Sequence, residues 1–416
     1  MNETVGVIDP PSQWPSGKIS GVPYWVFQRE DVYAREQKQL FRGNCWNYLC
    51  LDSEIATVGN YVATHVGDTP VLVIRGRDGE IYAFENRCAH RGALLALKNR
   101  GQMKDITCVY HGWSYSFEGD LVGIAFKDGI NGKGGMPQDF CMNEHGPKKL
   151  RVTTLHGLVF GSFSNDVPDI EEYLGKKVIP YIGRIMGKKT PVILGRFSQT
   201  LPNNWKHYIE NTKDSYHASI LHLFFNTFEI NRMSQRGEII VNDWGGAHVS
   251  ISGTSGNGDV KAAYETEQLR ADSDFGLKDP SMLKGMDEFG DGINIQVLSL
   301  FPGFALSQIQ NVIHLRQILP RGPESMQLNW TILGFEEDTP EQRLMRMRQG
   351  NMVGAAGFVS MEDGCIGGFV QRGTAGSSDV DSLIEMGGRE ADSSESRVTE
   401  SAIRGFWKAY RREMAL

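Results

Sequence analysis

Hydrophobic and polar positions follow two different periods along this chain, and the change of period divides it into regions. Residues 23–45 place apolar side chains at helical spacing among charged ones, which predicts an N-terminal helix. From residue 46 to 165, short β-rich runs such as Thr69–Arg75 and Ile81–Asn86 are separated by glycine-containing turns. We therefore predict a small antiparallel β-domain over residues 46–165.

The rest of the chain, residues 1–45 and 166–416, is predicted to form a second, larger domain. Helical spacing returns over residues 171–186, and two strands are predicted later, at Phe304–Leu319 and at Gln327–Gly334. The predicted fold class is therefore α+β, with an antiparallel sheet flanked by helices in the larger domain.

The C-terminal region is predicted to contain two loops and one helix. Residues 373–382 and 388–396 are rich in serine, glycine and acidic residues, which is typical of loops. In the segment that starts at Arg397, apolar side chains recur every fourth residue, which predicts an amphipathic helix. The four apolar positions are Val398, Ala402, Phe406 and Tyr410.

Composition and charge exclude several classes of protein. The 416 residues are 40% hydrophobic and 22% charged, and the formal net charge is −7, unlike the basic surface of a nucleic-acid-binding protein. No apolar run reaches the roughly 18 residues of a membrane helix, and the N-terminus has no leader pattern, so we expect a cytoplasmic protein. A small anionic substrate would need a local arginine site in this acidic chain.

Two of the six cysteines have the spacing of metal ligands. Cys88 and His90 form a C-x-H pair, and Cys108 and His111 form a C-x2-H pair. Two thiolates and two imidazoles can hold either a tetrahedral zinc ion or a [2Fe–2S] cluster, with the cysteines on one iron and the histidines on the other. The order differs from the zinc-finger order, which favours the cluster. The remaining cysteines are expected to be small buried apolar side chains; they are Cys45, Cys50, Cys141 and Cys365.

Asp214, His217 and His222 form a second candidate metal site. Two histidines and one carboxylate on one face of an iron leave positions open for oxygen. Residues five apart on an ideal helix point about 140° from one another. We therefore predict a π-type bulge or a helix break between His217 and His222.

These motifs together resemble those of the Rieske non-haem iron ring-hydroxylating oxygenases, large subunit. CAHRG (88–92) with CVYHGW (108–113) resembles the family's Rieske [2Fe–2S] domain, and 203–222 resembles its iron-binding segment. The resemblance implies a helix-grip, START-like catalytic domain in which His217 and His222 bind mononuclear Fe(II). It implies a third ligand from GFVSMEDGCIGGF (357–369), where the register favours Asp363, with the adjacent Glu362 as the alternative.

The resemblance also implies an electron route between subunits. Asp214 matches the family residue that bridges an iron ligand and a Rieske histidine of the neighbouring subunit, so the expected route is His111–Asp214–His217 in a closed ring of subunits. Electrons would come from NAD(P)H through a separate reductase, and a small beta subunit would complete an α3β3 assembly.

Within the family the resemblance is greatest to the terephthalate dioxygenase group, on segments such as LPNNWK (201–206) and RGFWKAYR (404–411). Two arginines that would hold the two substrate carboxylates match Arg316, at the end of a predicted strand, and Arg397, at the start of the last predicted helix. Arginine suits this role because its planar fork grips a carboxylate with two hydrogen bonds.

The implied activity is O2-dependent cis-dihydroxylation of terephthalate. A salicylate- or anthranilate-type enzyme of the same framework is the alternative. A Rieske electron carrier without an oxygen site is a third reading, which would leave the second metal motif without a purpose.

Overall fold

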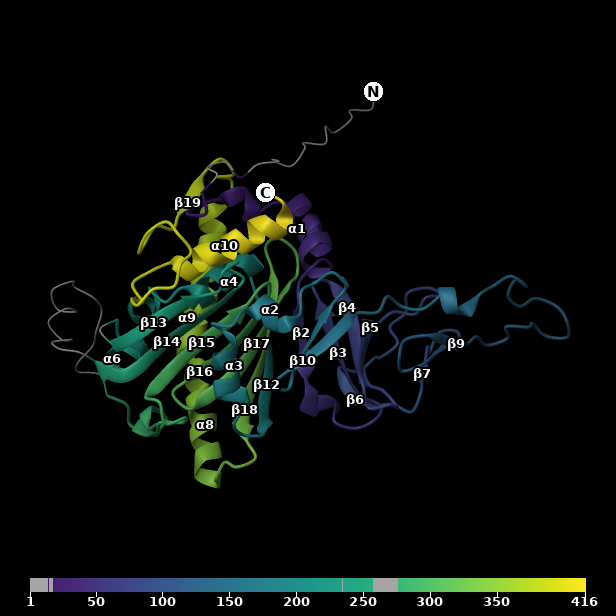
Figure 1. The fold of residues 1–416 in the computed structure, drawn as a ribbon, viewed down its shortest axis with the longest axis horizontal. Coiled ribbons are helices and arrows are strands. Elements are labelled where there is room, and N and C mark those ends of the chain that lie inside the picture. The colour runs from purple at the N-terminus through teal and green to yellow at the C-terminus, as the bar shows by residue number, and fades with distance from the viewer. Residues whose placement is uncertain (1–13, 15–17, 234, 257–275) are drawn as a thin grey trace. The chain divides into compact units, whose positions relative to one another are not determined.

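The computed structural model describes residues 14, 18–233, 235–256 and 276–416. The chain divides into two compact units, one of residues 40–170 and the other of residues 1–39 together with 171–416 (Figure 1). Most of the N-terminal segment on which the expectation about a leader is based lies outside the described residues. Among the described helices, none combines the length and the apolar character that a bilayer crossing requires.

The smaller unit consists of short antiparallel strands, as its β-rich runs and glycine-containing turns predict. Its sheets have the orders β5-β4-β3-β6, β10-β11-β2 and β7-β8-β9. The turn between β3 and β4 has Gly67 at φ 56°, which a glycine adopts without strain in a tight hairpin. The strands are β2 (Asn47–Leu51), β3 (Asn60–Val66), β4 (Thr69–Arg75), β5 (Ile81–Glu85), β6 (Arg100–Gln102), β7 (Ile106–Thr107), β8 (Ser114–Tyr115), β9 (Leu121–Gly123), β10 (Arg151–Leu155) and β11 (Leu158–Ser162).

The larger unit is built on a seven-stranded antiparallel sheet with the order β12-β18-β17-β16-β15-β14-β13. This architecture confirms the predicted α+β class with a flanked antiparallel sheet. The strands of this unit are β1 (Gly21–Pro23), β12 (Pro191–Leu201), β13 (Gln235–Val241), β14 (Ala247–Gly256), β15 (Ile293–Leu300), β16 (Phe304–Ile309), β17 (Val312–Pro320), β18 (Met326–Phe335) and β19 (Asp381–Leu383). The helices are α1 (Glu30–Glu36), α2 (Ile170–Leu174, at the boundary of the units), α3 (Ile179–Met186), α4 (Trp205–Lys213), α5 (Ala218–Leu221), α6 (Leu223–Thr227), α8 (Pro340–Val353), α9 (Phe358–Thr374) and α10 (Ser401–Met414).

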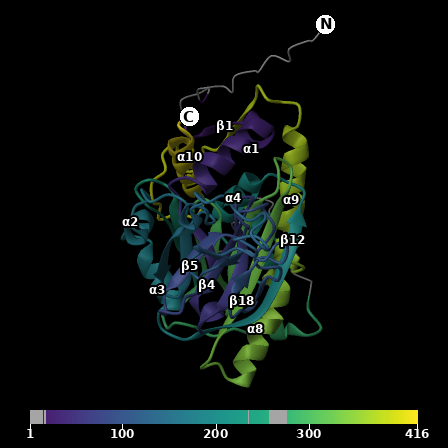
Figure 2. The same ribbon diagram turned by 90° about the vertical axis from the view of Figure 1, so that its right-hand side faces the viewer.

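Helices cover both faces of this sheet. Successive side chains of a strand point to opposite faces, so each strand contacts helices on both sides. Ile295 of β15 and Ile309 of β16 pack in one apolar cluster with Met352 of α8. Their neighbours Gln296 and Gln308 point the other way, and both accept hydrogen bonds from Arg184 of α3. Contacts of α4 with β15 and β17 place it over the sheet, and Figure 2 shows α8 and α9 along its β12–β18 side.

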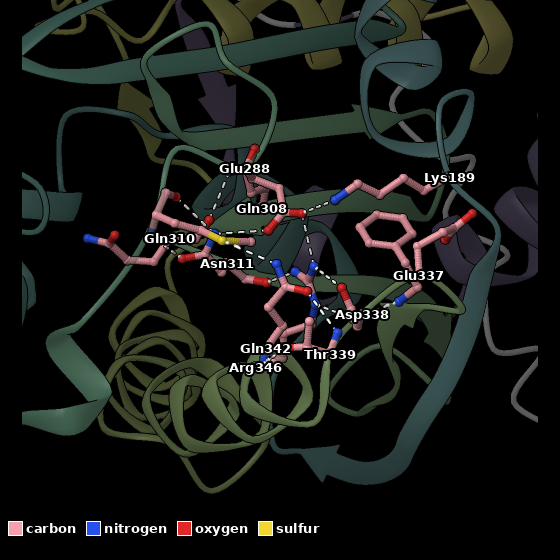
Figure 3. Close-up of polar contacts among 12 residues, drawn as sticks. Lys189, Glu288, Gln308, Gln310, Asn311, Glu337, Asp338, Thr339, Gln342 and Arg346 are labelled. Carbon is pink, nitrogen blue, oxygen red and sulfur yellow. Dashed lines mark hydrogen bonds and ion pairs between the residues drawn. The ribbon is translucent and has the colours of Figure 1, made fainter.

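Buried ion pairs and hydrogen bonds connect α8 to the sheet face against which it packs (Figure 3). Arg346 of α8 pairs with Asp338 (2.7 Å) and with Glu288 (2.9 Å), and neither carboxylate side chain is more than 1% exposed. Lys189 also pairs with Glu288, at 2.8 Å. Arg346 further donates to the backbone oxygen of Asn311 in the turn between β16 and β17. The network therefore joins a loop, a hairpin and a helix.

Several elements differ from their sequence-based prediction. The predicted single strand Phe304–Leu319 is a hairpin, β16 and β17, with Gln310 at φ 55° in its turn. The predicted helix over residues 23–45 covers less, since β1 ends at Pro23 and helical structure proper begins at Glu30 and continues through a π-helical turn to Phe41. The predicted helical region 171–186 is broken after α2, where Gly175 has φ 79° and ends the helix.

The expectation that four cysteines are buried apolar side chains is half correct. Cys45 and Cys50 are buried, whereas Cys141 and Cys365 are exposed. Cys365 lies on α9, whose glycine-rich sequence gives no clear apolar stripe from which its face could be predicted.

Candidate active site

The segment with the candidate metal ligands begins with α4 and ends that helix sharply. Asn204 caps α4 by accepting a hydrogen bond from the backbone N–H of Lys206 at 3.1 Å. Asp214 leaves the helix, with φ −85° and ψ 102°. Its Oδ1 accepts from the backbone N–H groups of Tyr216 (2.7 Å) and His217 (3.2 Å), so the aspartate both stops one helix and starts the next turn.

A helix break at His222 brings the two candidate histidines together. α5 ends at Leu221 and α6 begins at Leu223, while His222 between them has φ −85° and ψ 87°. The predicted break is therefore present. The rings of His217 and His222 have centroids 5.2 Å apart at an interplanar angle of 73°.

Asp363 on α9 completes a group of three possible ligands. Its Oδ1 lies 3.5 Å from Nε2 of His217 and 3.3 Å from Nε2 of His222. Each of the three residues offers one atom within 4.8 Å of the others, which is the arrangement of a two-histidine, one-carboxylate iron site.

The second ring nitrogen of each histidine faces a different carboxylate. Asp214 Oδ2 lies 3.3 Å from Nδ1 of His217, and Glu362 Oε2 lies 2.8 Å from Nδ1 of His222. A carboxylate on Nδ1 fixes the ring orientation and leaves Nε2 for a metal. Glu362, the alternative third ligand, thus lies behind His222 rather than beside both Nε2 atoms.

The electrostatics of this group favour a cation. Burial lowers the pKa of His217, but the hydrogen bonds to Asp214 and Asp363 outweigh it and raise that pKa to about 10. The pKa of His222 is raised by Asp363 and Glu362 against the same effect of burial. Burial raises the pKa of the Asp363 carboxyl, whereas the two imidazoles lower it by more, to well below its usual range. Positive charge is therefore drawn to this point, as a metal ion would be.

The candidate ligands line a cavity with a volume of about 80 Å³. Ile295, Val297 and Ile309 of the sheet give part of its lining an apolar character, and both candidate substrate arginines line it as well. An apolar cavity with a few converging polar groups is the usual form of a small-molecule site.

Arg316 is buried in this cavity, and among the described residues its hydrogen-bond partners are neutral. Its Nη1 donates to Tyr208 Oη (3.2 Å) and its Nη2 to Ser307 Oγ (3.0 Å), while within the described residues Nε has no hydrogen-bond acceptor. Arg316 lies in the middle of β17, since the strand continues to Pro320, so its predicted place at a strand end is wrong. A buried guanidinium without a carboxylate has binding capacity left for an anion.

Arg397 reaches the cavity from a loop. The last helix begins at Ser401, so the predicted place of Arg397 at a helix start, with support from the helix dipole, is wrong. Its Nη1 donates to Asn231 Oδ1 at 2.5 Å, and its Nη2 donates to the backbone oxygen of Arg232. These contacts orient the guanidinium in place of the helix dipole.

In the smaller unit, the four predicted cluster ligands lie on two loops with the same backbone pattern. Gly92 N–H donates to Cys88 O, and Gly112 N–H donates to Cys108 O, at 2.9 and 3.0 Å. Both glycines have positive φ, 76° and 66°, which closes each loop tightly. The cysteines are buried, while the rings of His90 and His111 are exposed with centroids 4.6 Å apart.

Comparisons with known proteins give these two sites a family. The family model for the Rieske [2Fe–2S] domain matches residues 45–131, and the model for the ring-hydroxylating alpha subunit (catalytic domain) matches residues 190–416, more than half of the chain. The chain belongs to the ring-hydroxylating oxygenases. This ring-hydroxylating dioxygenase alpha subunit is an oxidoreductase whose two domains carry a Rieske [2Fe–2S] cluster and a mononuclear iron.

Individual relatives agree with this family. The chain is 54% identical over 403 residues to the terephthalate 1,2-dioxygenase terminal oxygenase component subunit alpha 2 of Comamonas sp., covering 97% of both chains. It is 43% identical over 402 residues to the anthranilate 1,2-dioxygenase large subunit of Burkholderia cepacia, covering 96% of this chain and 95% of the relative. The fold matches that of naphthalene 1,2-dioxygenase from Rhodococcus sp. bound to indole with a TM-score of 0.79, at 20% identity over 95% of this chain and 94% of the other.

The residues of both sites fit the two iron groups. In the smaller unit, buried thiolates and exposed imidazoles agree with a cluster whose histidine side faces outward, and the Rieske match excludes the zinc alternative. In the larger unit, two Nε2 atoms and one carboxylate oxygen converge, and the carboxylates of Asp214 and Asp363 raise the pKa of His217, which agrees with a site for a cation.

Three supporting residues escaped the sequence analysis. Asn211 donates to Asp363 Oδ1 at 3.0 Å, and the only hint of it is its place one helical turn before the metal motif. Tyr208, which holds Arg316, is on the same helix. Asn231 accepts a hydrogen bond from Arg397, which lies 166 residues later in the chain. No motif in the sequence indicates this contact.

Proposed function

We propose that this alpha subunit catalyses the cis-dihydroxylation of terephthalate to its 1,2-cis-dihydrodiol. The observation that carries the proposal is the presence of Arg316 and Arg397 in the cavity that the candidate metal ligands line. A substrate with one carboxylate needs one such arginine, so a pair favours a dicarboxylate.

The arrangement of the lining residues supports a substrate with charges at both ends. Across the sheet, the lining runs from Arg316 on β17 through Ile309 on β16 and Val297 on β15 to Ser250 on β14. Arg397 is bonded near the next strand, β13, where its Nη2 donates to Gln235 O at 3.4 Å. Strands are spaced about 4.8 Å apart. Three strands separate β17, which carries Arg316, from β13, which the loop residue Arg397 contacts, and aliphatic side chains lie between the two guanidinium groups. An aromatic ring with para carboxylates has the same order of charged, apolar and charged parts.

In this proposal His217, His222 and Asp363 hold the iron, and Glu362 and Asp214 orient the two imidazoles. Bound iron supplies the oxygen chemistry, in which both atoms of O2 are added to one face of the ring with two electrons and two protons. The protein positions the ring through the two arginines and excludes water with the aliphatic lining of the cavity. When a metal binds, each histidine can give up the Nε2 proton and keep the Nδ1 proton, because Nδ1 faces a carboxylate.

Asp214 is proposed to connect the iron site to the electron supply. Its Oδ2 faces His217, and in a closed ring of subunits it would also bond the neighbouring subunit's Rieske histidine, which in sequence is His111. A separate reductase would deliver electrons from NAD(P)H, and a small beta subunit would complete an α3β3 assembly.

Turnover by the reconstituted system tests the substrate. Terephthalate, isophthalate, phthalate, salicylate and anthranilate are supplied with a reductase and NADH, and products are identified by mass spectrometry. Formation of a terephthalate cis-dihydrodiol well above all other products supports the proposal. A preferred conversion of salicylate or anthranilate would contradict it and favour the alternative activity.

A further inference from the structure

A buried lysine lies next to the substrate cavity, and none of the described acidic residues pairs with it. Lys213, the last residue of α4, is 2% exposed, and its neighbours Thr212 and Asp214 both line the cavity. Its Nζ lies 3.3 Å from Nδ1 of His248, and within the described residues it forms no ion pair. Buried ammonium groups normally pair with a carboxylate, because an unpaired charge in a dry interior is costly.

The lysine is connected to the sheet row that holds Arg316. Nδ1 of His248 also lies 2.7 Å from Ser299 Oγ, and His248 pairs with Ser299 in the sheet register. Ser299 pairs with Ala305, and Ala305 pairs with Arg316. All four residues therefore point to the face covered by α4, and the small side chain of Ala305 leaves room for the helix.

The surroundings of Lys213 allow a bound ligand to change its protonation state. Burial lowers the pKa of Lys213 to about 7. Burial, then Lys213, then Arg316 lower the pKa of His248, which keeps that imidazole neutral. The other titratable or charged groups on α4 are Lys206, His207, Tyr208 and Glu210. The elements packed against α4 carry Glu362, Asp363, Cys365 and Arg372 on α9, Arg404, Lys408, Tyr410, Arg411, Arg412 and Glu413 on α10, and His314 and Arg316 on β17, and Asp214 and Glu400 lie at the adjoining helix ends. The carboxylates among them have other partners: Trp407 for Glu210, His217 for Asp214, His222 for Glu362, the two histidines for Asp363, Met386 N–H for Glu400 and Arg412 for Glu413.

We propose that Lys213 is a proton-switched cation of the substrate site, which takes up one proton when an aromatic carboxylate binds at Arg316. This inference rests on the dicarboxylate function proposed above. An incoming carboxylate adds negative charge to a region of low dielectric that holds Arg316 and no acidic partner for Lys213, which stabilises the ammonium form. The proton comes from solvent, binds to the amine of Lys213, and returns to solvent when the ligand leaves.

The sign of the pH effect follows from this uptake. At low pH Lys213 already carries its proton, and binding is strongest. As pH rises above about 7, binding must first draw a proton from solvent, so the apparent Kd increases by up to about tenfold per pH unit until the pKa of the ligand-bound state is reached.

Calorimetry on the intact holoenzyme tests this proton uptake directly. Terephthalate is titrated anaerobically into the iron-loaded enzyme at pH 8, in buffers with different enthalpies of ionisation. The slope of observed enthalpy against buffer enthalpy gives the number of protons taken up. We expect the wild type to take up close to one proton and Lys213→Met to take up none, with a Kd that is flat between pH 7 and 8.

Two further variants keep the test decisive. Lys213→Arg, with a permanent charge, should bind tightly with no proton uptake, and it replaces Lys213→Met if that variant fails to fold. Lys408→Met removes an exposed lysine that bonds Asp243 O (2.8 Å), and should keep the wild-type uptake. Terephthalate binding without proton uptake in the wild type, or equal uptake in the Lys213 variants, would overturn this inference alone. Absence of any terephthalate binding would instead overturn the proposed substrate, and the inference with it.

Discussion

Glu362 Oε2 lies 2.8 Å from Nδ1 of His222, on the far side of the ring from Asp363. Adjacent acidic residues of one helix thus face opposite nitrogens of one imidazole. Their substitutions should therefore have different effects. Asp363→Ala should remove the mononuclear iron, leaving the two cluster irons of the three per chain. Glu362→Ala should keep that iron but weaken its binding by about 10- to 100-fold.

Iron quantitation after dialysis against a graded series of chelator concentrations separates these outcomes. The visible spectrum of the Rieske cluster is the control for folding in both variants. If Glu362→Ala lost the iron as completely as Asp363→Ala, the separate roles assigned here would be wrong.

Metal binding should become tighter as pH rises. His217 has its pKa raised to about 10, so a metal ion at Nε2 must displace a proton at any pH below that value. The apparent affinity should increase by at least about tenfold per pH unit between pH 6.5 and 8.5. Anaerobic competition with a chelator of known pH dependence measures this. A pH-independent affinity would mean that His217 does not bind the metal.

The two arginines should each contribute to substrate recognition. Arg316→Gln and Arg397→Gln each remove a charged hydrogen-bond donor, which corresponds to about 1.5–3 kcal/mol, or roughly 10- to 100-fold in kcat/KM for terephthalate. Benzoate, with one carboxylate, should respond strongly to only one of the two substitutions. Arg321→Gln is a matched control, because Arg321 bonds Gln327 Oε1 at 3.0 Å and does not line the cavity. Unchanged terephthalate kinetics in Arg397→Gln would leave the dicarboxylate proposal without its second site.

The reduction potential of the cluster should depend on Tyr115. Its Oη accepts from the backbone N–H of Ala89 at 2.9 Å and lies 3.1 Å from Cys88 Sγ, so the hydroxyl proton is directed at the sulfur. A donor to the sulfur stabilises the reduced, more negative cluster. Tyr115→Phe should lower the potential by roughly 20–65 mV, the equivalent of one neutral hydrogen bond in a one-electron couple. Spectroscopic redox titration measures the shift, and a potential that stayed the same or rose would contradict this role.

Stability should depend strongly on the buried charges around α8. Arg346→Met leaves the carboxylates of Glu288 and Asp338 buried without their main partner, so we expect a loss of about 3–5 kcal/mol in the free energy of unfolding. Arg389→Met, which breaks a solvent-exposed pair with Glu385, should cost far less, because water and salt screen an exposed pair. Urea denaturation of both variants provides the comparison. Equal losses would show that the α8 network does not act as a buried unit.

The sequence predicted the parts of the fold that depend on local pattern. The seven-stranded sheet includes the predicted strand Gln327–Gly334 almost unchanged, and the break at His222 follows from helix geometry once both histidines are assigned to one metal ion. The hairpin of β16 and β17 was missed because its turn contains Gln310 and Asn311, without a glycine, between two apolar runs. The position at which such a run folds back depends on its register with neighbouring strands. The local sequence pattern carries no information about that register.

The candidate site was predictable where its residues lie close together in sequence and less so elsewhere. His217 and His222 stand in one motif, whereas Asp363 comes from a distant helix and needed the family resemblance. Arg397 was placed at a helix start because apolar spacing continues through Val398, yet the helix begins only at Ser401. Long-range contacts with Asn231 decide its position.

The helix break at His222 has a consequence for the order in which the molecule loosens. Short helices such as α5 and α6 are marginal alone, and the group formed by His217, His222 and Asp363 ties this broken segment to the long helix α9. A metal held there acts as a cross-link between parts of the chain that are remote in sequence. Loss of iron would therefore allow the α5–α6 segment to unfold locally first. Amide protons of that segment would exchange with solvent while those of the sheet remained protected.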